Sequence, residues 1–235
     1  ARRICGSWPA GARCEATSLN ILEKGLRVTT LRATVCWVSM VLCLASAGAP
    51  ENRYRFAGYV STQVRPSRVV VADVSGSGAL DAVVISEGIL AAKGIAGRSL
   101  QVYEGNYLGG FTSSFTGALS SVPTALAVAE LDPEDGPRIL IADVDGLLTI
   151  YGRIGLAWSN FGELMLGNAP AALVAEDLDG DGMIDIAAAN NGSDNIVVYY
   201  GQGELAFDAA RVYTVGSAPT ALCCADFNGD GRKDL

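Results

Sequence analysis

The chain has 235 residues, of which 50% are hydrophobic and 18% are charged, so it can bury a core and is not a disordered polar segment. It contains no histidine, which excludes Ser-His-Asp and Cys-His catalysis within these residues. The net charge is −8, and residues 1–47 are net positive, so the remainder is more acidic still. An acidic surface repels phosphate backbones and attracts cations, and nucleic acid is therefore not an expected partner.

The N-terminal region has the pattern of a targeting sequence. A basic residue precedes an apolar run from Val35 to Ala45, and Ala45-Ser46-Ala47 fits the small-x-small cleavage rule. The pattern predicts a signal peptide at 28–47, a secreted, cell-surface or periplasmic protein, and no stable membrane span after cleavage. An uncleaved anchor is the alternative, although the apolar run is short for one. Residues 1–27 are expected to be an upstream or disordered segment.

Four later segments align without gaps, and each begins with a proline. They are PSRVVVADVS (66–75), PTALAVAELD (123–132), PAALVAEDLD (170–179) and PTALCCADFN (219–228). Seven places after each proline stands an acid, and twelve places before each proline stands an aromatic residue: Tyr54, Phe111, Trp158 and Phe207. Aromatic residues make up only 7% of the chain, so this agreement indicates an internal repeat.

Each repeat predicts four short strands. After Pro170 come the apolar runs AALVAED, MIDIAAAN and IVVYYG, then a weaker run at 207–215, and the loops between them hold Gly, Asn, Ser and Asp. No segment has a helical period of useful length. The repeat prolines follow one another at 57, 47 and 49 residues (66 to 123, 123 to 170, 170 to 219). Four-stranded units at this interval predict an all-β fold, a β-propeller.

The repeats divide a propeller at 48–235 into blades. We expect full blades at 66–122, 123–169 and 170–218, and the start of a fourth at 219–235. Residues 54–65 resemble the last strand of a blade and are expected to be the outer strand that closes the ring. About three full blades and the start of a fourth cannot close a propeller, which needs at least about four. The sequence therefore predicts an incomplete propeller, the N-terminal fragment of a longer protein.

Two loops carry the pattern D-x-[DN]-x-D-G-x-x-D, namely DLDGDGMID (177–185) and DFNGDGRKD (226–234). Oxygen atoms at positions 1, 3, 5 and 9 can converge if the position-6 glycine allows a sharp turn, and the position-7 carbonyl can add a ligand. Such hard oxygen ligands suit Ca²⁺, although an acidic turn that binds nothing is the alternative. The expected ligands are Asp177, Asp179, Asp181, the Met183 carbonyl and Asp185, then Asp226, Asn228, Asp230, the Arg232 carbonyl and Asp234.

The two corresponding loops upstream depart from this pattern. DVSGSGALD (73–81) keeps its first and last acids but has serine at its middle positions, so its metal binding is left open. ELDPEDGPRI (130–139) is interpreted with an insertion that puts Ile139 in the place of the last acid, and it is expected to be free of metal. An EF-hand is a poor fit to the two intact loops, because its last acid comes at position 12 and helices flank it.

These loops, with the strands that follow them, resemble the FG-GAP/VCBS repeat family, the β-propeller blades also found in integrin α-subunits. The resemblance covers 54–235, and Phe207 and Gly216-Ser217-Ala218-Pro219 look like the family's Phe and G-x-P segment. It implies Ca²⁺ in the loop between the first two strands of a blade. It also implies a secreted or surface protein, as is typical of bacterial members.

The sequence thus predicts a secreted, non-catalytic binding or adhesion propeller with structural Ca²⁺ and an unidentified extracellular protein or carbohydrate ligand. The excursion at 87–100 is a candidate binding loop, although a tolerated insertion is the simpler interpretation. The alternative is the propeller of an extracellular polysaccharide-active enzyme whose catalytic residues lie elsewhere, and a third interpretation assigns the function to another domain of a larger surface protein. The acids outside the metal loops form no recognisable pair: Asp143, Asp145, Glu163, Asp194, Glu204 and Asp208.

Overall fold

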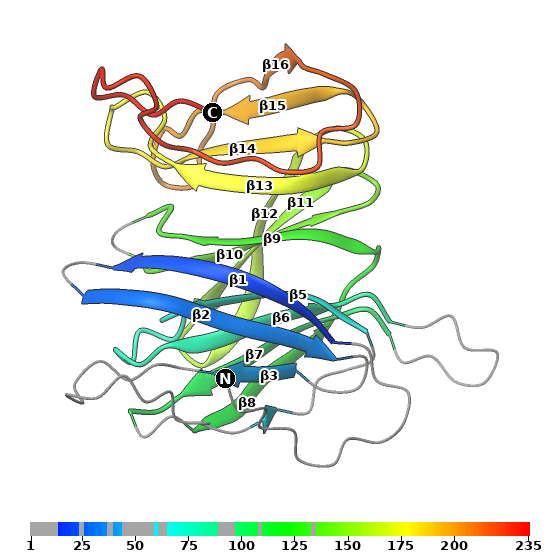
Figure 1. The fold of residues 1–235 in the computed structure, drawn as a ribbon, viewed down its shortest axis with the longest axis vertical. Coiled ribbons are helices and arrows are strands. Elements are labelled where there is room, and N and C mark those ends of the chain that lie inside the picture. The colour runs from blue at the N-terminus through cyan, green and yellow to red at the C-terminus, as the bar shows by residue number, and fades with distance from the viewer. Residues whose placement is uncertain are drawn as a thin grey trace, which may run out of the picture.

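The structure is a computed structural model, and the residues it describes are built from β-strands (Figure 1). With side chains, it describes 65–88, 97–107, 110–132 and 135–235. Upstream it describes the backbone of four strands in one antiparallel sheet, β1 (Cys14–Glu23), β2 (Leu26–Cys36), β3 (Met40–Cys43) and β4 (Tyr59–Val60). No helix with the length and hydropathy of a membrane span occurs in the described part of the chain.

The N-terminal predictions concern processing and ring closure. The upstream segment (1–27) and the signal peptide (28–47) stay predictions, because strand geometry does not report whether a segment is removed from the mature protein. Of the outer strand expected at 54–65, the structure describes β4, in the fourth position of its sheet, and Arg65. The rest of that strand, and most of the excursion at 87–100, lie outside the described residues.

Three further antiparallel sheets have four strands each, and in each sheet the strands lie side by side in the order in which they follow one another in the chain. Their first strands begin at the repeat prolines, as the pattern predicts. The strands are β5 (Pro66–Ala72), β6 (Asp81–Ser86), β7 (Ser99–Gly105) and β8 (Phe111–Ala118); β9 (Pro123–Ala129), β10 (Arg138–Asp143), β11 (Leu147–Ile154) and β12 (Ala157–Met165); and β13 (Pro170–Glu176), β14 (Asp185–Asn190), β15 (Asn195–Tyr199) and β16 (Arg211–Thr214).

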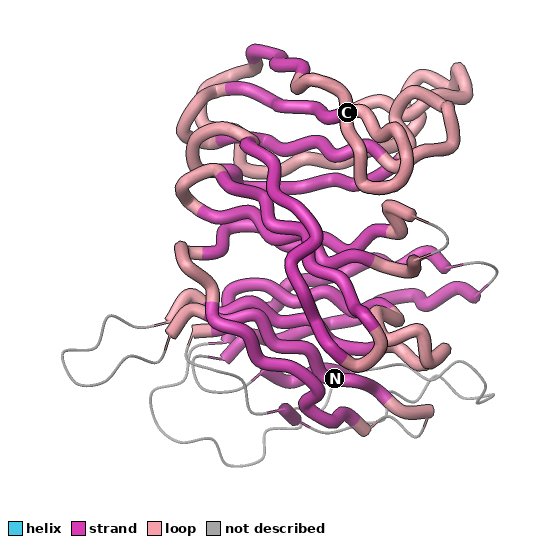
Figure 2. The backbone as a smooth tube through the Cα atoms, turned by 180° about the vertical axis from the view of Figure 1, so that it is seen from behind, coloured by secondary structure: helices cyan, strands magenta, loops and turns pink. Residues whose placement is uncertain are grey.

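The sheets are arranged as neighbouring propeller blades (Figures 1 and 2). The first strands lie side by side, since β9 contacts β5 and also β13. After Pro219 the chain continues the repeat, and an antiparallel bridge joins Ala225 to Asp234. The predicted all-β propeller, with three full blades and the start of a fourth, is confirmed.

The second strand of each blade lies at the centre of the packing. All six residues of β6, β10 and β14 are buried. Successive side chains of β10 face opposite sides of the sheet: Ile139 and Ile141 pack in the core shared with the first blade, whereas Leu140 and Ala142 pack in the core shared with the third. A strand buried on both faces is apolar along its middle, which explains the apolar runs in the sequence, and the polar residues of these strands stand at their ends.

Candidate metal centre

The loop at 177–185 joins β13 to β14 and folds around its first carboxylate. Gly180 (φ +86°) and Gly182 (φ +89°) adopt the left-handed conformation that glycine allows without a steric penalty. As a result their N–H groups donate to the Asp177 carboxylate at 2.7 and 3.0 Å. The turn thus holds Asp177 in place with backbone donors alone.

The last carboxylate of the loop, Asp185, is the first residue of β14 and is fully buried. It accepts hydrogen bonds from the backbone N–H groups of Leu178 and Gly201, each at 2.8 Å. Leu178 belongs to the same loop and Gly201 follows β15, so one carboxylate joins the loop to β14 and to the end of β15.

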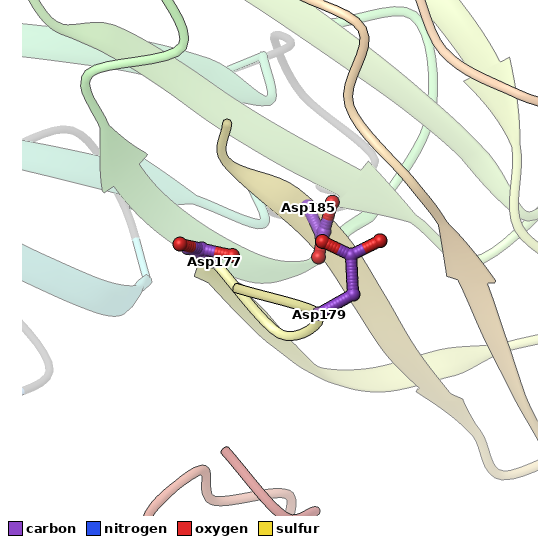
Figure 3. A group of neighbouring side chains, drawn as sticks. All are labelled: Asp177, Asp179 and Asp185. Atoms are coloured by element: carbon purple, nitrogen blue, oxygen red, sulfur yellow. The ribbon is translucent and has the colours of Figure 1, made fainter. Parts of the chain in front are cut away.

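Three carboxylates converge around this loop (Figure 3). Ligand oxygens of Asp177, Asp179 and Asp185 all lie within 4.8 Å of one another. Burial raises the pKa of Asp185, and the negative charges of Asp179 and Asp181 add to this effect, while its two backbone hydrogen bonds oppose it. The group therefore concentrates negative charge that the blade neutralises only in part.

This group fits a divalent cation such as Ca²⁺. Its donors are hard oxygens, and a carboxylate oxygen that accepts one backbone hydrogen bond keeps another lone pair for a metal. Asp181, which was also expected as a ligand, is placed differently. The Asp181 carboxylate is exposed and accepts the Met183 N–H at 2.7 Å, outside the converging group. Ligation by Asp181 and by the Met183 carbonyl stays a prediction.

The loop at 226–234 repeats the turn, with Gly229 (φ +80°) and Gly231 (φ +86°) in the left-handed conformation. The N–H groups of Gly231 and Gly229 donate to Asp226 and lower its pKa. The remaining polar side chains bond within the loop. Asn228 donates to Asp230 at 3.1 Å, the Arg232 N–H donates to Asp230 at 2.8 Å, and Asp234 accepts the Phe227 N–H at 2.9 Å.

Three carboxylates do not converge in this second loop in the way that they do at 177–185, as far as the described residues show. One reason is chemical, because position 3 is an amide, Asn228. The expected ligand set Asp226, Asn228, Asp230, Arg232 and Asp234 therefore stays a prediction.

The loop at 73–81 keeps the turn and its first and last acids but not the acids between them. Gly76 (φ +72°) and Gly78 (φ +82°) repeat the same backbone conformation. Asp73 accepts the N–H groups of Ser77 and Gly78, and Asp81 accepts those of Ser75 and Gly105. The turn thus forms with two serines at the middle positions, so the backbone shape of the loop does not require acidic residues there.

The expected insertion at 130–139 is wrong. Across the first two strands, Arg138 pairs with Ala129 as Asp185 pairs with Glu176 and Asp81 with Ala72. Arg138, not Ile139, therefore stands at position 9, and the loop has the same length as the others. Its glycine has moved from position 6 to position 7, where Gly136 has a φ of +75°, and this shift gave the appearance of an insertion.

Two kinds of residue were missed by sequence reasoning. Position 2 of the loop is a buried apolar anchor: Val74, Leu131 and Leu178 each pack in the core between two blades. Two glycines near the end of the third strand, Gly105 and Gly201, leave room for a carbonyl of the loop and donate to the buried Asp. Both could have been found, since position 2 is apolar in all four loops and VYEG recurs as VYYG.

The acids considered for an enzyme have contacts typical of turns and loops. Asp143 accepts the N–H groups of Asp145 and Leu147 in the turn between β10 and β11. The other contacts are from the Ser121 hydroxyl to Asp145, from the Asn160 amide to Glu163, and from the Ala218 N–H to Asp194. Glu204 and Asp208 are exposed after β15. The enzyme alternative stays a prediction without a supporting site in the described part of the chain.

Comparison with known families identifies the region that holds both intact loops. The sequence of residues 177–235 matches the family described as FG-GAP-like repeat. This region is similar to an FG-GAP-like repeat. The resemblance to the FG-GAP/VCBS family is thus confirmed for these residues, which contain the converging carboxylates together with β14, β15 and β16. A search of the curated proteins finds no match.

Solved structures with the same fold include two of BBS1N in complex with ARL6DN, one soaked with mercury and one with lead. Their TM-scores are 0.60 and 0.59 at 11% and 12% sequence identity. The alignments cover 92% and 90% of this chain but only 56% and 54% of those chains, so this chain spans little more than half their length. At this identity, the likeness shows the propeller fold alone.

Proposed function

We propose that the chain is a secreted, calcium-stabilised propeller that acts as a non-catalytic binding or adhesion module. The observation that carries the proposal is the convergence of Asp177, Asp179 and Asp185 on the loop between the first two strands of a blade. An ion there would bind the loop, β14 and, through the Asp185 contact with Gly201, the end of β15. Such an ion stabilises the blade rather than taking part in a reaction.

Calcium outside cells is abundant enough for such a site. Extracellular modules hold Ca²⁺ with dissociation constants of about 10⁻⁴ to 10⁻³ M. The predicted signal peptide at 28–47 agrees with this environment. N-terminal sequencing of the secreted protein checks that part of the proposal, with a mature start near Gly48 as the expected result.

The binding role follows from the way propellers present loops. Rigid blades hold loops at their ends, and a ligand is recognised by loops that differ between blades. The BBS1N propeller is itself solved in complex with another protein, ARL6DN. For the present chain we propose an extracellular protein or carbohydrate as ligand.

Calcium titration followed by thermal unfolding tests the metal site. We expect Ca²⁺ to raise the melting temperature and a chelator to lower it. Asp185→Ala combined with Asp234→Ala should remove most of the gain, because these substitutions delete the last carboxylate of each intact loop. Asp208→Ala is the control: it removes an exposed acid outside both loops and should keep the gain.

A melting temperature that does not respond to Ca²⁺ or to the chelator would contradict the proposal. The same conclusion would follow if the control and the double variant lost the calcium effect equally, since the effect would then reflect overall charge.

A further inference from the structure

Arg138 takes the place of an acid at the start of the second strand. Asp81, Asp185 and Asp234 hold this place in the other loops, as the strand pairing shows. The Arg138 side chain is only 1% exposed, so a full positive charge is buried where its neighbours carry a negative one. A buried charge destabilises a fold unless polar groups surround it, so the partners of Arg138 decide its role.

The guanidinium of Arg138 points back into its own loop. It donates to the backbone carbonyl of Asp135 at 2.9 Å, to that of Gly136 at 3.3 Å, and to the Asp135 carboxylate at 3.0 Å. Its central carbon lies 4.4 Å from the centre of the Phe161 ring, within cation–π range. Carbonyl and carboxylate oxygens are also the groups that surround a bound Ca²⁺.

The loop supplies negative charge for this cation to neutralise. Positions 1, 3, 5 and 6 are all acidic: Glu130, Asp132, Glu134 and Asp135. An acidic loop of this kind would repel itself without a positive charge close by. Arg138 brings that charge on a side chain.

A second change in the sequence makes room for the arginine. A Cβ atom at Gly152 of β11 would lie 2.8 Å from Cδ of Arg138 and equally close to the Phe161 ring. In the first and third blades the corresponding glycine comes one place later, in VYEG and VYYG against IYGR, and its N–H binds the buried Asp. The first and third blades thus combine a buried Asp with a glycine at the later position, whereas the second blade combines Arg138 with a glycine at the earlier position.

We propose that Arg138 is a built-in substitute for the metal ion in the second blade. Its guanidinium ties the end of the loop, Asp135 and Gly136, to the start of β10, so this blade keeps its shape without Ca²⁺. The comparison with calcium-loaded loops rests on the proposed function, whereas the need for a positive charge at Arg138 does not.

The charge is tested in the full chain with chelator present by comparing Arg138→Met with Arg138→Lys. Methionine keeps an apolar stem and removes the charge, whereas lysine keeps the charge and loses the forked geometry. We expect Arg138→Met to lower the melting temperature by about 5–10 °C and Arg138→Lys to lower it by clearly less. Arg211→Met is the control, because Arg211 also covers an aromatic ring, that of Tyr200, but is exposed; it should shift the temperature little.

Equal losses for Arg138→Met and Arg138→Lys would overturn the proposal, since the forked hydrogen bonds of the guanidinium, and not its charge, would then explain the arginine. No loss for Arg138→Met would overturn it as well, since the apolar stem would then be sufficient. If Arg138→Met does not fold while Arg138→Lys does, the requirement for charge is supported.

Hydrogen exchange of the unmodified protein tests the substitution for metal. We expect Ca²⁺ to slow exchange at 177–190 and to leave 130–143 unchanged. Slower exchange at 130–143 would mean that this loop takes an ion, and the proposal would fall. If neither segment responds, the proposed calcium function fails, while the comparison of lysine with methionine still decides the role of Arg138.

Discussion

Asp185 makes two contributions of opposite sign to the stability of the folded chain. Its hydrogen bonds from Leu178 and Gly201 hold the loop against the sheet, while its burial beside other acids raises its pKa. A carboxylate with a raised pKa binds a proton more readily in the folded chain than in the unfolded chain. In the calcium-free protein this contribution to stability is fully present below the ordinary pKa of 3.8 and is lost as pH rises through the folded pKa.

The pH dependence of an Asp185→Asn variant tests this sign. Asparagine carries no charge, so the stability of the variant does not depend on this protonation. In chelator, the free energy of unfolding of the variant relative to that of the unmodified protein should be highest at neutral pH and should decrease as pH falls toward 4. Each unit of pKa shift corresponds to about 1.4 kcal/mol of this difference. Denaturant unfolding of both proteins over this pH range measures it, and a difference that does not change with pH would contradict the raised pKa.

At the scale of the element, the loops that begin at Asp73, Glu130 and Asp177 are each fixed at two points. The last residue of each loop begins the central strand of the blade, and its position-2 residue enters the core between two blades. Leu178 packs there with Ala187 and Val198 of its own blade and with Leu222 and Cys224 of the next. The loop is therefore part of the contact between blades, and an ion bound in it would strengthen that contact.

Leu178→Ala should lower the stability of the fold and also weaken Ca²⁺ binding. We expect a loss of about 2–3 kcal/mol in the free energy of unfolding, because a buried leucine is truncated, and weaker Ca²⁺ binding, because the loop loses its anchor. Denaturant unfolding in chelator and calcium titration measure the two effects. Met165→Ala, at a residue that is 61% exposed, is the control and should change neither by much. Unchanged calcium affinity in Leu178→Ala would show that the loop does not need its anchor.

The whole molecule is a row of blades in which stability can differ from one to the next. The first strands lie side by side, and cores form between successive blades. Arg153 of the second blade adds an ion pair to Glu104 of the first at 3.0 Å. In arrays of this kind, each unit is stabilised chiefly by its immediate neighbours. Loss of calcium should thus act locally rather than on the whole chain.

Limited proteolysis checks this local effect. With chelator present, we expect faster cleavage in the loops at 177–185 and 226–234, while β5 to β12 stay intact. Mass spectrometry of the fragments gives the cleavage sites, and added Ca²⁺ should restore protection. Cleavage that spreads evenly over all blades would instead indicate that the molecule opens as one unit.

The sequence by itself determined the blade pattern. The spacing of Pro66, Pro123 and Pro170, and the apolar runs after them, predicted where each sheet begins, because strand burial and turns follow from local composition. It also predicted the loop that carries Asp177, Asp179 and Asp185, since these lie within nine residues and the glycines between them permit a tight turn.

Only the tertiary structure decided which groups meet. The place of Arg138 depended on strand pairing. A shifted glycine makes its loop look longer than it is in the sequence, whereas the pairing of Arg138 with Ala129 puts Arg138 at position 9 of the loop. The Gly201 contact to Asp185 joins residues 16 apart in sequence, and the Leu178 core joins two blades. Contacts of this kind arise when separate strands pack together, so a local pattern of residues does not contain them.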